Sequence, residues 1–375
     1  MSQALRVLVV DDSALMRKLI PQLLGRDGSI EVVGTAMDGE FALDKIADLK
    51  PHVITLDLEM PRKDGLETLR EIVRSHKLPV IVVSSHSTDG ASVTLRALAM
   101  GAFDFVAKPQ AKLADEMERV AGELIYKIKT AAASANLHNT VLPAERTAFR
   151  AAGAGRGRGV KKPAAIKASP TAIVAIGVST GGPNALQQML PQLPADFPGT
   201  ILVVQHMPEG FTAMFARRLN ESCTVRVKEA QSGDLLQAGR VLICPGNRHM
   251  RVRRMPLGMV VALSDEERVN GHRPSVDVLF HSVAQEAGPK TVAVLMTGMG
   301  EDGAEGLGAI KRAGGVTIAQ SAESCVVFGM PRAAIERGHV QRVLPLDQLA
   351  CTLHAHCAAP RVAPATRLKA ALETT

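Results

Sequence analysis

Aromatic side chains and paired cysteines are scarce in this sequence. Of its 375 residues none is tryptophan and only one, Tyr126, is tyrosine, which argues against a nucleic-acid surface built on aromatic stacking. The 5 cysteines are scattered, and no two of them form a C-x-x-C pair. We therefore expect reduced thiols, and neither a disulfide framework nor a zinc site.

Long hydrophobic runs are also missing. No uninterrupted apolar stretch reaches the length that spans a bilayer. The first apolar run, Leu5–Val10, is too short for a signal peptide and is followed at once by Asp11 and Asp12. These features predict a cytoplasmic protein without membrane insertion.

Positive charge is concentrated in one segment. The formal net charge is +7, and residues 130–170 alone hold seven basic residues and one acidic residue. This segment is rich in alanine and glycine and shows no apolar period, so it cannot build a core. We interpret it as a flexible basic linker and expect no nucleic-acid partner, with an RNA-binding arm as the alternative.

Residues 1–129 alternate between short apolar runs and segments of helical period. The apolar runs are Leu5–Val10, Ile30–Gly34, Val53–Leu56, Val80–Val83 and Phe103–Ala107. The helical segments are Leu15–Leu24, Glu40–Leu49, Leu66–Arg74, Ser92–Met100 and Leu113–Lys129. Five such units predict a (βα)5 domain whose parallel sheet is covered on both faces, in flavodoxin-like strand order.

Three carboxylates follow strands that this order places side by side. Asp11 and Asp12 come directly after the first strand, and Asp57 comes directly after the third. Because functional loops lie at the carboxyl ends of parallel strands, the three carboxylates would share one small site. Left alone they would repel and raise one another's pKa, whereas Mg²⁺ binds carboxylate and phosphate oxygens together.

A hydroxyl and an ammonium complete this edge of the sheet. Ser84 follows the fourth strand and Lys108 follows the fifth, so both could hold a phosphoryl group on Asp57. Taken one by one, Asp11 and Asp12 could be helix caps and Lys108 a solvated charge. Their coincidence at successive strand ends favours a phosphorylation site.

The same strand ends carry a family resemblance. The motifs are V-V-D-D-S at 9–13, T-L-D-L-E-M-P at 55–61, V-V-S-S at 82–85 and A-K-P at 107–109. They resemble those of response-regulator receiver domains, over residues 5 to about 127. By this resemblance Asp57 is the phosphoacceptor, in a Mg²⁺ site with Asp11 and Asp12, and a histidine kinase is the phosphodonor. The remaining implied roles are Ser84 as switch hydroxyl, Lys108 as phosphate contact and Phe105 as rotating aromatic.

Apolar runs and helical segments alternate again over residues 171–347. Strand candidates are Ile173–Gly177, Thr200–Val204, Val225–Val227, Val241–Cys244, Met259–Leu263, Thr291–Met296 and Val316–Ala319. Helix candidates are Asn184–Leu190, Thr212–Asn220, Val276–Ala287, Ala304–Ala313 and Pro331–Arg337. We predict a second, doubly wound and mostly parallel α/β domain, with residues 348–375 as a C-terminal tail.

A serine stands in a tight glycine turn at the start of this domain. The run Ile173–Gly177 leads into G-V-S-T-G-G-P, where Gly177 and Gly181 bracket Ser179, and a helical segment follows. In this context G-x-S-x-G indicates a nucleophile, because free N–H groups at the helix start suit an oxyanion. By itself the pattern could also be a chance match, a packing turn or a phosphate cradle.

Two further strand ends supply a base and an acid. His206 follows the run Thr200–Val204, and Asp302 lies in the glycine-rich loop after Thr291–Met296. With Ser179 they would form a triad in which the serine attacks, the imidazole carries the proton and the carboxylate orients it. The chain order Ser…His…Asp differs from that of α/β-hydrolases, so we expect a different fold. The rival acids are Asp265, Asp277 and Glu301, and the rival bases are His249, His272 and His281.

Longer motifs carry a second family resemblance. These are G-V-S-T-G-G-P at 177–183, Q-H-M-P at 205–208, R-P-S-V-D at 273–277 and L-M-T-G-M-G-E-D-G at 295–303. They are similar to motifs of the chemotaxis protein-glutamate methylesterases, in which a receiver precedes the catalytic domain. The resemblance implies demethylation of glutamate γ-methyl esters, and deamidation of certain glutamines, on methyl-accepting chemotaxis receptors. It also implies no cofactor for the esterase reaction, an oxyanion donor at the N–H of Met299 and a polar neighbour of the nucleophile at Thr180.

Together the two resemblances imply a phosphorylation-activated serine hydrolase that serves sensory adaptation, with a chemotaxis histidine kinase as phosphodonor. The receiver would restrain the Ser179 site until phosphorylation of Asp57 shifts Ser84 and Phe105. The alternative is a receiver that drives a binding output without catalysis, through the glycine loops and the basic linker. No Walker pattern supports that alternative.

Overall fold

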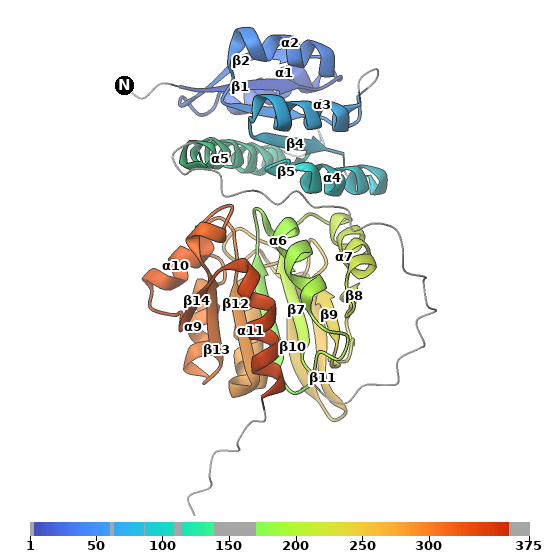
Figure 1. Cartoon of the computed structure of the whole chain (residues 1–375), viewed down its shortest axis with the longest axis vertical. Coiled ribbons are helices and arrows are strands. Elements are labelled where there is room, and N and C mark those ends of the chain that lie inside the picture. Colours follow the sequence, from blue (N-terminus) through green and yellow to red (C-terminus); the bar gives the residue numbers. More distant parts are fainter. Residues whose placement is uncertain (1–3, 61–63, 86, 109–113, 139–169, 360–375) are drawn as a thin grey trace, which may run out of the picture.

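The computed structural model describes residues 4–60, 64–85, 87–108, 114–138 and 170–359, which form two α/β domains (Figure 1). Most of the predicted linker, residues 139–169, and the end of the predicted tail, residues 360–375, lie outside the described residues. Within the described ranges, no helix has both the length and the apolar character needed to cross a membrane.

The N-terminal domain has the predicted strand order. Its strands are β1 (Leu5–Val10), β2 (Ile30–Ala36), β3 (Val53–Leu56), β4 (Val80–Ser84) and β5 (Asp104–Ala107). They pair in the order β2-β1-β3-β4-β5, and every pair is parallel. Because Val10 pairs with Leu56, the next residues, Asp11 and Asp57, leave the sheet side by side. β3 and β4 are buried along their whole length, as expected for a sheet with helices on both faces.

Two helices of this domain are longer than predicted. The helices are α1 (Met16–Leu24), α2 (Gly39–Leu49), α3 (Gly65–Glu71) with a π turn (Ile72–His76), α4 (Thr88–Met100) and α5 (Ala114–His138). α4 begins earlier than predicted because the Ser87 side chain accepts a hydrogen bond from the Gly90 N–H and caps it. α5 continues past the predicted end at Lys129 because its buried stripe continues through Ile128 and Ala131. Residues 130–138, predicted as linker, therefore belong to this helix.

The C-terminal domain is built on a seven-stranded sheet in the order β14-β13-β12-β6-β7-β9-β8, in which every pair is parallel. Its strands are β6 (Ile173–Val178), β7 (Thr200–Gln205), β8 (Arg226–Glu229), β9 (Arg240–Ile243), β12 (Thr291–Leu295), β13 (Val316–Gln320) and β14 (Arg342–Leu344). Its helices are α6 (Gly182–Met189), α7 (Phe211–Ser222), α8 (Val276–Ala287), α9 (Ala304–Arg312), α10 (Met330–Glu336) and α11 (Leu346–Ala358).

Helices cover both faces of this sheet, so the predicted doubly wound architecture is confirmed. Alternate residues of β6 face opposite layers. Val174 and Ile176 pack in one buried cluster with residues of α6, α7 and α11. Ile173 and Ala175 pack in another with residues of α8, α9 and α10. The central strand β6 is therefore buried on both sides, and it ends in the serine turn.

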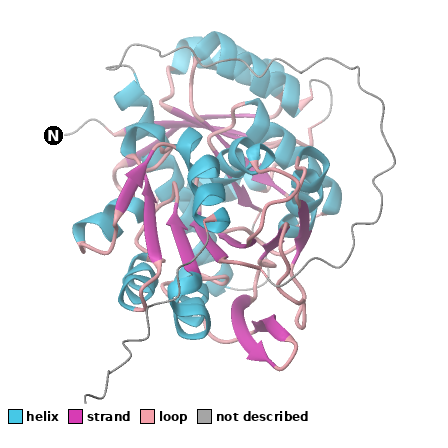
Figure 2. Ribbon diagram, turned by 60° about the horizontal axis from the view of Figure 1, so that its bottom comes forward, coloured by secondary structure: helices cyan, strands magenta, loops and turns pink. Residues whose placement is uncertain are grey.

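A separate antiparallel hairpin was not predicted. β10 (His249–Met255) pairs with β11 (Gly258–Ser264) in a two-stranded sheet of its own. β11 contains the predicted strand 259–263 but lies outside the parallel sheet. β10 has no clear sequence signal because arginines at 251, 253 and 254 interrupt its apolar pattern. Figure 2 shows the hairpin at the lower edge of the domain.

The predicted tail begins too early. Residues 348–358 belong to α11, which lies beside α6 on one face of the sheet (Figure 1). Leu349, Leu353 and Cys357 recur at every fourth position and are buried, so α11 is part of the core. The sequence signal is weak because small or polar residues fill most positions between them.

Leu353→Ala tests whether α11 stabilises the domain. Removing this fully buried side chain leaves a cavity, and we expect the free energy of unfolding to fall by about 2–5 kcal/mol. Urea unfolding of the full chain measures the change, and Cys351→Ala, at an exposed position of the same helix, is the control. A change no larger than that of the control would contradict the assignment of α11 to the core.

Candidate functional site

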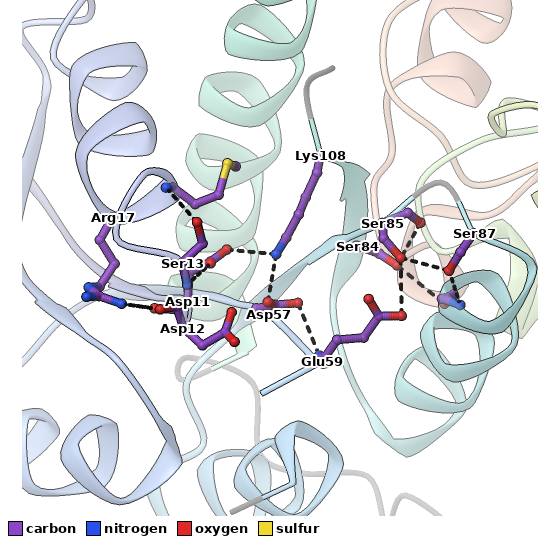
Figure 3. Close-up of polar contacts among 12 residues, drawn as sticks. Asp11, Asp12, Ser13, Arg17, Asp57, Glu59, Ser84, Ser85, Ser87 and Lys108 are labelled. Carbon is purple, nitrogen blue, oxygen red and sulfur yellow. Dashed lines mark hydrogen bonds and ion pairs between the residues drawn. The ribbon is translucent and has the colours of Figure 1, made fainter. Parts of the chain in front are cut away.

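The acidic cluster of the N-terminal domain lies at the carboxyl edge of its sheet (Figure 3). Carboxylate oxygens of Asp11, Asp12 and Asp57 all lie within 4.8 Å of one another. Asp11 and Asp57 are buried, whereas Asp12 is exposed. Lys108 Nζ lies 2.6 Å from Asp57 Oδ2 and 3.1 Å from Asp11 Oδ2. The structure therefore brings together four residues that the sequence predicted at this edge.

The charge balance of this cluster is negative. Burial raises the pKa of Asp57 to about 6, although the hydrogen bond and charge of Lys108 act in the opposite direction. Asp11 raises the pKa of Asp57 further through like-charge repulsion. One ammonium facing three carboxylates leaves excess negative charge, and the donor set consists of oxygen atoms alone. These properties fit the predicted Mg²⁺ ligands.

Ser84 and Phe105 lie away from the carboxylates. Ser84 Oγ accepts a 2.6 Å hydrogen bond from the Thr94 hydroxyl on α4, and it contacts none of the three carboxylates in the described structure. The ring of Phe105 on β5 stacks on Phe211 at the start of α7, with 4.8 Å between centroids and 22° between planes. The predicted switch hydroxyl thus faces α4, and the predicted rotating aromatic is held between the domains.

Further contacts join the two domains around this aromatic pair. α4 packs against α6 and α7, and Asn184 Nδ2 donates a 3.0 Å hydrogen bond to the Leu98 carbonyl. Leu95 and Leu98 of α4 share one buried apolar cluster with Phe211 and Phe215 of α7. In Figure 1, α4, β5 and α5 are the elements of the receiver that face the second domain.

Ser179 follows β6 in the predicted strand, glycine turn and helix. Val178 pairs with Gln205 of β7, so Ser179 and His206 leave adjacent strands at the same level. The Ser179 N–H donates a 3.0 Å hydrogen bond to the Thr297 carbonyl, which ties the turn to the loop after β12. Gly181 precedes α6 with a φ of 77°, a conformation that residues with side chains rarely adopt.

His206 and Asp302 form a buried pair. His206 Nε2 lies 2.9 Å from Asp302 Oδ2, and their side chains are 8% and 0% exposed, so water scarcely competes for this contact. Among the described residues, His206 Nδ1 is buried and has no hydrogen-bond partner. The structure therefore pairs two of the three predicted triad residues directly. Ser179 lies at the neighbouring strand end, and among the described residues no hydrogen bond joins its hydroxyl to His206.

Asp302 is held in its ionised form. Burial alone would raise the pKa of Asp302, but the hydrogen bond and charge of His206, with two donors at the start of α8, hold it below its ordinary value. The donors are the Val276 N–H and the Ser275 hydroxyl, each at 2.7 Å. The positive end of the α8 dipole favours the same anion.

Asn270, Ser275 and Val276 were not predicted as site residues. Asn270 Nδ2 donates to Asp302 Oδ1 at 3.0 Å and to Asp277 Oδ2 at 2.7 Å. Ser275 does carry a sequence signal, because a serine before a helical segment is a common helix cap. Asn270 carries none, since only the path of its loop brings it to Asp302.

The rival acids have other partners. Asp277 accepts a hydrogen bond from the Gly306 N–H, and burial raises its pKa. The other two rivals form ion pairs at the surface, Asp265 with Arg248 and Glu301 with Arg337. None of the three contacts His206 among the described residues.

The rival bases differ from one another. His249 bonds to the Glu267 carbonyl, and His281 is exposed on α8. His272 lies in the site, because its ring stacks on His206 with 3.9 Å between centroids and 8° between planes. The sequence suggested His272 only as an alternative to His206, whereas the structure places the two rings together.

Thr180 and Met299 flank the serine turn. Thr180 is buried, and its carbonyl accepts a 2.9 Å hydrogen bond from the Thr297 hydroxyl. A Cβ at Gly298 would lie 2.9 Å from Ser179 Cβ, so this loop approaches the serine only because residue 298 has no side chain. The Met299 N–H, one residue on, has no hydrogen-bond acceptor among the described residues.

Comparison with known proteins identifies both domains. The CheB methylesterase family model matches residues 174–353, and the response regulator receiver domain model matches residues 7–118. Protein-glutamate methylesterase/protein-glutamine glutaminase 2 of Koribacter versatilis (strain Ellin345) is 61% identical over 358 residues, which cover 96% of this chain and 98% of that protein. The corresponding protein of Symbiobacterium thermophilum is 47% identical, covering 92% and 95% of the two chains.

A solved structure is similar to the second domain. The crystal structure of the Thermotoga maritima CheB methylesterase catalytic domain is 41% identical, covers 50% of this chain and 99% of that one, and has a TM-score of 0.49. The sequence relatives span nearly the whole of both chains, and the two family models match in the predicted order. The chain therefore belongs to the protein-glutamate methylesterase/protein-glutamine glutaminase family, with a receiver domain ahead of a CheB methylesterase domain.

Proposed function

We propose that this chain removes methyl groups from glutamate γ-methyl esters, and deamidates specific glutamines, on methyl-accepting chemotaxis receptors when its receiver is phosphorylated. The observation that carries the proposal is the buried pair of His206 and Asp302 at 2.9 Å, one strand away from the serine turn. The receiver, predicted to end at residue 129, then extends to the end of α5 at His138. The catalytic domain begins at residue 171 and extends to the end of α11 at Ala358.

Ser179 is the nucleophile and His206 is the base. Ser179 Oγ attacks the γ-carbonyl carbon while His206 Nδ1 takes its proton, since Nε2 is already bonded to Asp302. The Met299 N–H stabilises the oxyanion, and Thr180 is the polar neighbour. When the intermediate collapses, the proton passes from His206 to the leaving group, which departs as methanol from an ester or ammonia from an amide.

Water completes the reaction by the same route. His206 takes a proton from the water as it attacks the acyl-enzyme, and the proton then returns to Ser179 Oγ as glutamate is released. Asp302 stays ionised throughout and stabilises the imidazolium that forms in each half of the reaction. Both reactions pass through a tetrahedral oxyanion, so one site serves ester and amide.

Ser179→Ala tests the nucleophile. We expect methanol release from a methylated receptor fragment to fall by at least about a thousandfold, because the reaction loses its nucleophile. A serine-directed fluorophosphonate should label the wild type at Ser179 and leave this variant unlabelled. Thr180→Ser is the matched control for changes in the turn, and it should keep its labelling. An unlabelled wild type that releases no methanol would favour the binding-output alternative.

Asp57 is the phosphoacceptor of the receiver in this proposal. A pKa of about 6 leaves most of its carboxylate ionised at neutral pH. An oxygen of this carboxylate would bond to the phosphorus of the kinase's phosphohistidine as the P–N bond breaks and the imidazole leaves. Asp11, Asp12 and Asp57 would hold Mg²⁺, which supplies positive charge against phosphoryl and carboxylate oxygens when bound. Lys108, already 2.6 Å from Asp57, would contact the phosphoryl group, and Ser84 would turn toward it.

Phosphorylation would act through the contact between the domains. If Ser84 leaves Thr94 for the phosphoryl group, α4 loses a buried hydrogen bond of 2.6 Å. Phe105 on the next strand would then leave its stack on Phe211, and the receiver would no longer restrain the edge that holds Ser179. This is a shift between two arrangements and adds no catalytic group.

Asp57→Asn tests the phosphoacceptor. With a small-molecule phosphodonor and Mg²⁺, wild-type methanol release should rise, and removal of Mg²⁺ with a chelator should abolish the rise. In the variant, the ratio of rates with and without phosphodonor should fall to about 1, because an amide cannot be phosphorylated. Asp48→Asn, an acid-to-amide change on α2 outside the cluster, should retain the wild-type ratio. Full stimulation of the Asp57 variant would refute the assignment.

Phe211→Ala tests the restraint. The loss of one aromatic stack is worth about 0.5–1.5 kcal/mol, so unstimulated methanol release should rise roughly 2- to 10-fold. Phe41→Ala removes a half-exposed phenylalanine on α2 and should leave the rate unchanged. Phe211 is fully buried, so its truncation also lowers the free energy of unfolding, and the rate is divided by the fraction of protein that the fluorophosphonate labels. An unchanged or lower rate after this correction would exclude the stack as the restraint.

A further inference from the structure

His272 lies against the face of His206 and is held there by its own loop. The two rings are nearly parallel, at 8°, with 3.9 Å between centroids. Val269 and His272 exchange two backbone hydrogen bonds of 3.1 and 2.9 Å, which close the loop at its tip. Between them, Asn270 donates to Asp302 and to Asp277. The loop that carries His272 is therefore anchored to the same carboxylate that binds His206.

The ring of His206 needs more than one contact to be fixed. The hydrogen bond to Asp302 fixes the position of Nε2. The ring can still rotate about the line that joins Cβ to Nε2, and this rotation would move Nδ1. A flat partner on one face removes this freedom. We propose that His272 is a positioning residue, which holds the plane of His206 so that Nδ1 is available to the hydroxyl of Ser179 when that hydroxyl turns toward it to react. This inference rests on the proposed roles of Ser179 and His206.

The electrostatics of His272 suit a partner that stays neutral. Burial, and next the charge of His206, lower the pKa of His272 to about 4. Arg268 acts in the same direction, whereas Asp302 and Glu123 of the receiver helix α5 act against it. At neutral pH His272 is therefore uncharged, so its ring does not oppose the positive charge that His206 acquires during the reaction.

His272 is not placed to be the base itself. No hydrogen bond joins its ring to any residue in the described part of the chain, and Asp302 is bonded to His206. An imidazole without a carboxylate partner lacks the group that would orient it and stabilise its charged form. Its distinguishing property is the flat face presented to His206, and a ring without nitrogen atoms should supply that face equally well.

His272→Ala and His272→Phe, made in the full chain, test this role. In the alanine variant we expect kcat for methanol release to fall about 10- to 100-fold, with KM changed less than about twofold, because substrate binds normally but the base is misaligned. The phenylalanine variant should recover kcat to within a few fold of wild type, with the acid limb of its pH profile unchanged. His281→Ala, a histidine exposed on α8, is the matched control.

Two results would overturn the proposal. A phenylalanine variant as slow as the alanine variant would show that a ring nitrogen of His272 takes part. An alanine variant with a normal kcat would show that the stack of His272 on His206 only stabilises the fold, whatever the melting temperature of the variant.

The ring nitrogen NMR signals of His206 separate this proposal from the function on which it rests. If the wild type releases no methanol, the esterase assignment fails, but the orientation of His206 can still be read. The Nε2–H signal bonded to Asp302 should stay sharp in the wild type and the phenylalanine variant, and broaden or shift in the alanine variant. Identical signals in all three proteins would refute the positioning role.

Discussion

A buried carboxylate that is paired with a histidine organises the catalytic domain. Among the described residues, the ion pair of Asp302 is with His206, and its remaining oxygen positions accept from Asn270, Ser275 and the start of α8. An ionised group in the interior is tolerated only when such donors replace water. The loop before α8, the helix itself and the turn after β12 must all be in place at once. The geometry of His206 follows from that requirement.

The proposed control of the site by the receiver depends on contacts between the two domains. In Figure 1, α4, β5 and α5 of the receiver face the second domain, and α4 packs against α6 and α7. Glu123 of α5 lies within electrostatic range of His272 in the second domain, because its carboxylate acts to raise the pKa of His272. The contact between the domains is mainly apolar: Phe105 stacks on Phe211, and residues of α4 share a buried cluster with residues of α7. A hydrogen bond from Asn184 to the Leu98 carbonyl lies beside it. Contacts of this kind can be made and broken at modest cost, as a switch requires.

Some features could be predicted from the sequence because they depend on local order. Parallel strands tend to be buried and to appear as continuous apolar runs, so eleven of the twelve described strands of the two parallel sheets, and the residues that follow them, could be located along the chain. Asp11, Asp57, Ser179 and His206 each stand directly after such a run. Strand β10 and helix α11 were not predicted in this way. Arginines interrupt the apolar pattern of β10, and small or polar residues interrupt that of α11.

The sequence by itself therefore determined the two α/β domains, their order, the family and the residues that stand at the strand ends. Only the tertiary structure decided which of those residues meet. It paired His206 through Nε2 with Asp302, brought Asn270 and His272 to the site from a loop with no motif, and placed Phe105 against Phe211 from the other domain. Strand ends depend on the local apolar pattern, whereas these contacts depend on sheet register and loop paths, which involve residues far apart in the chain.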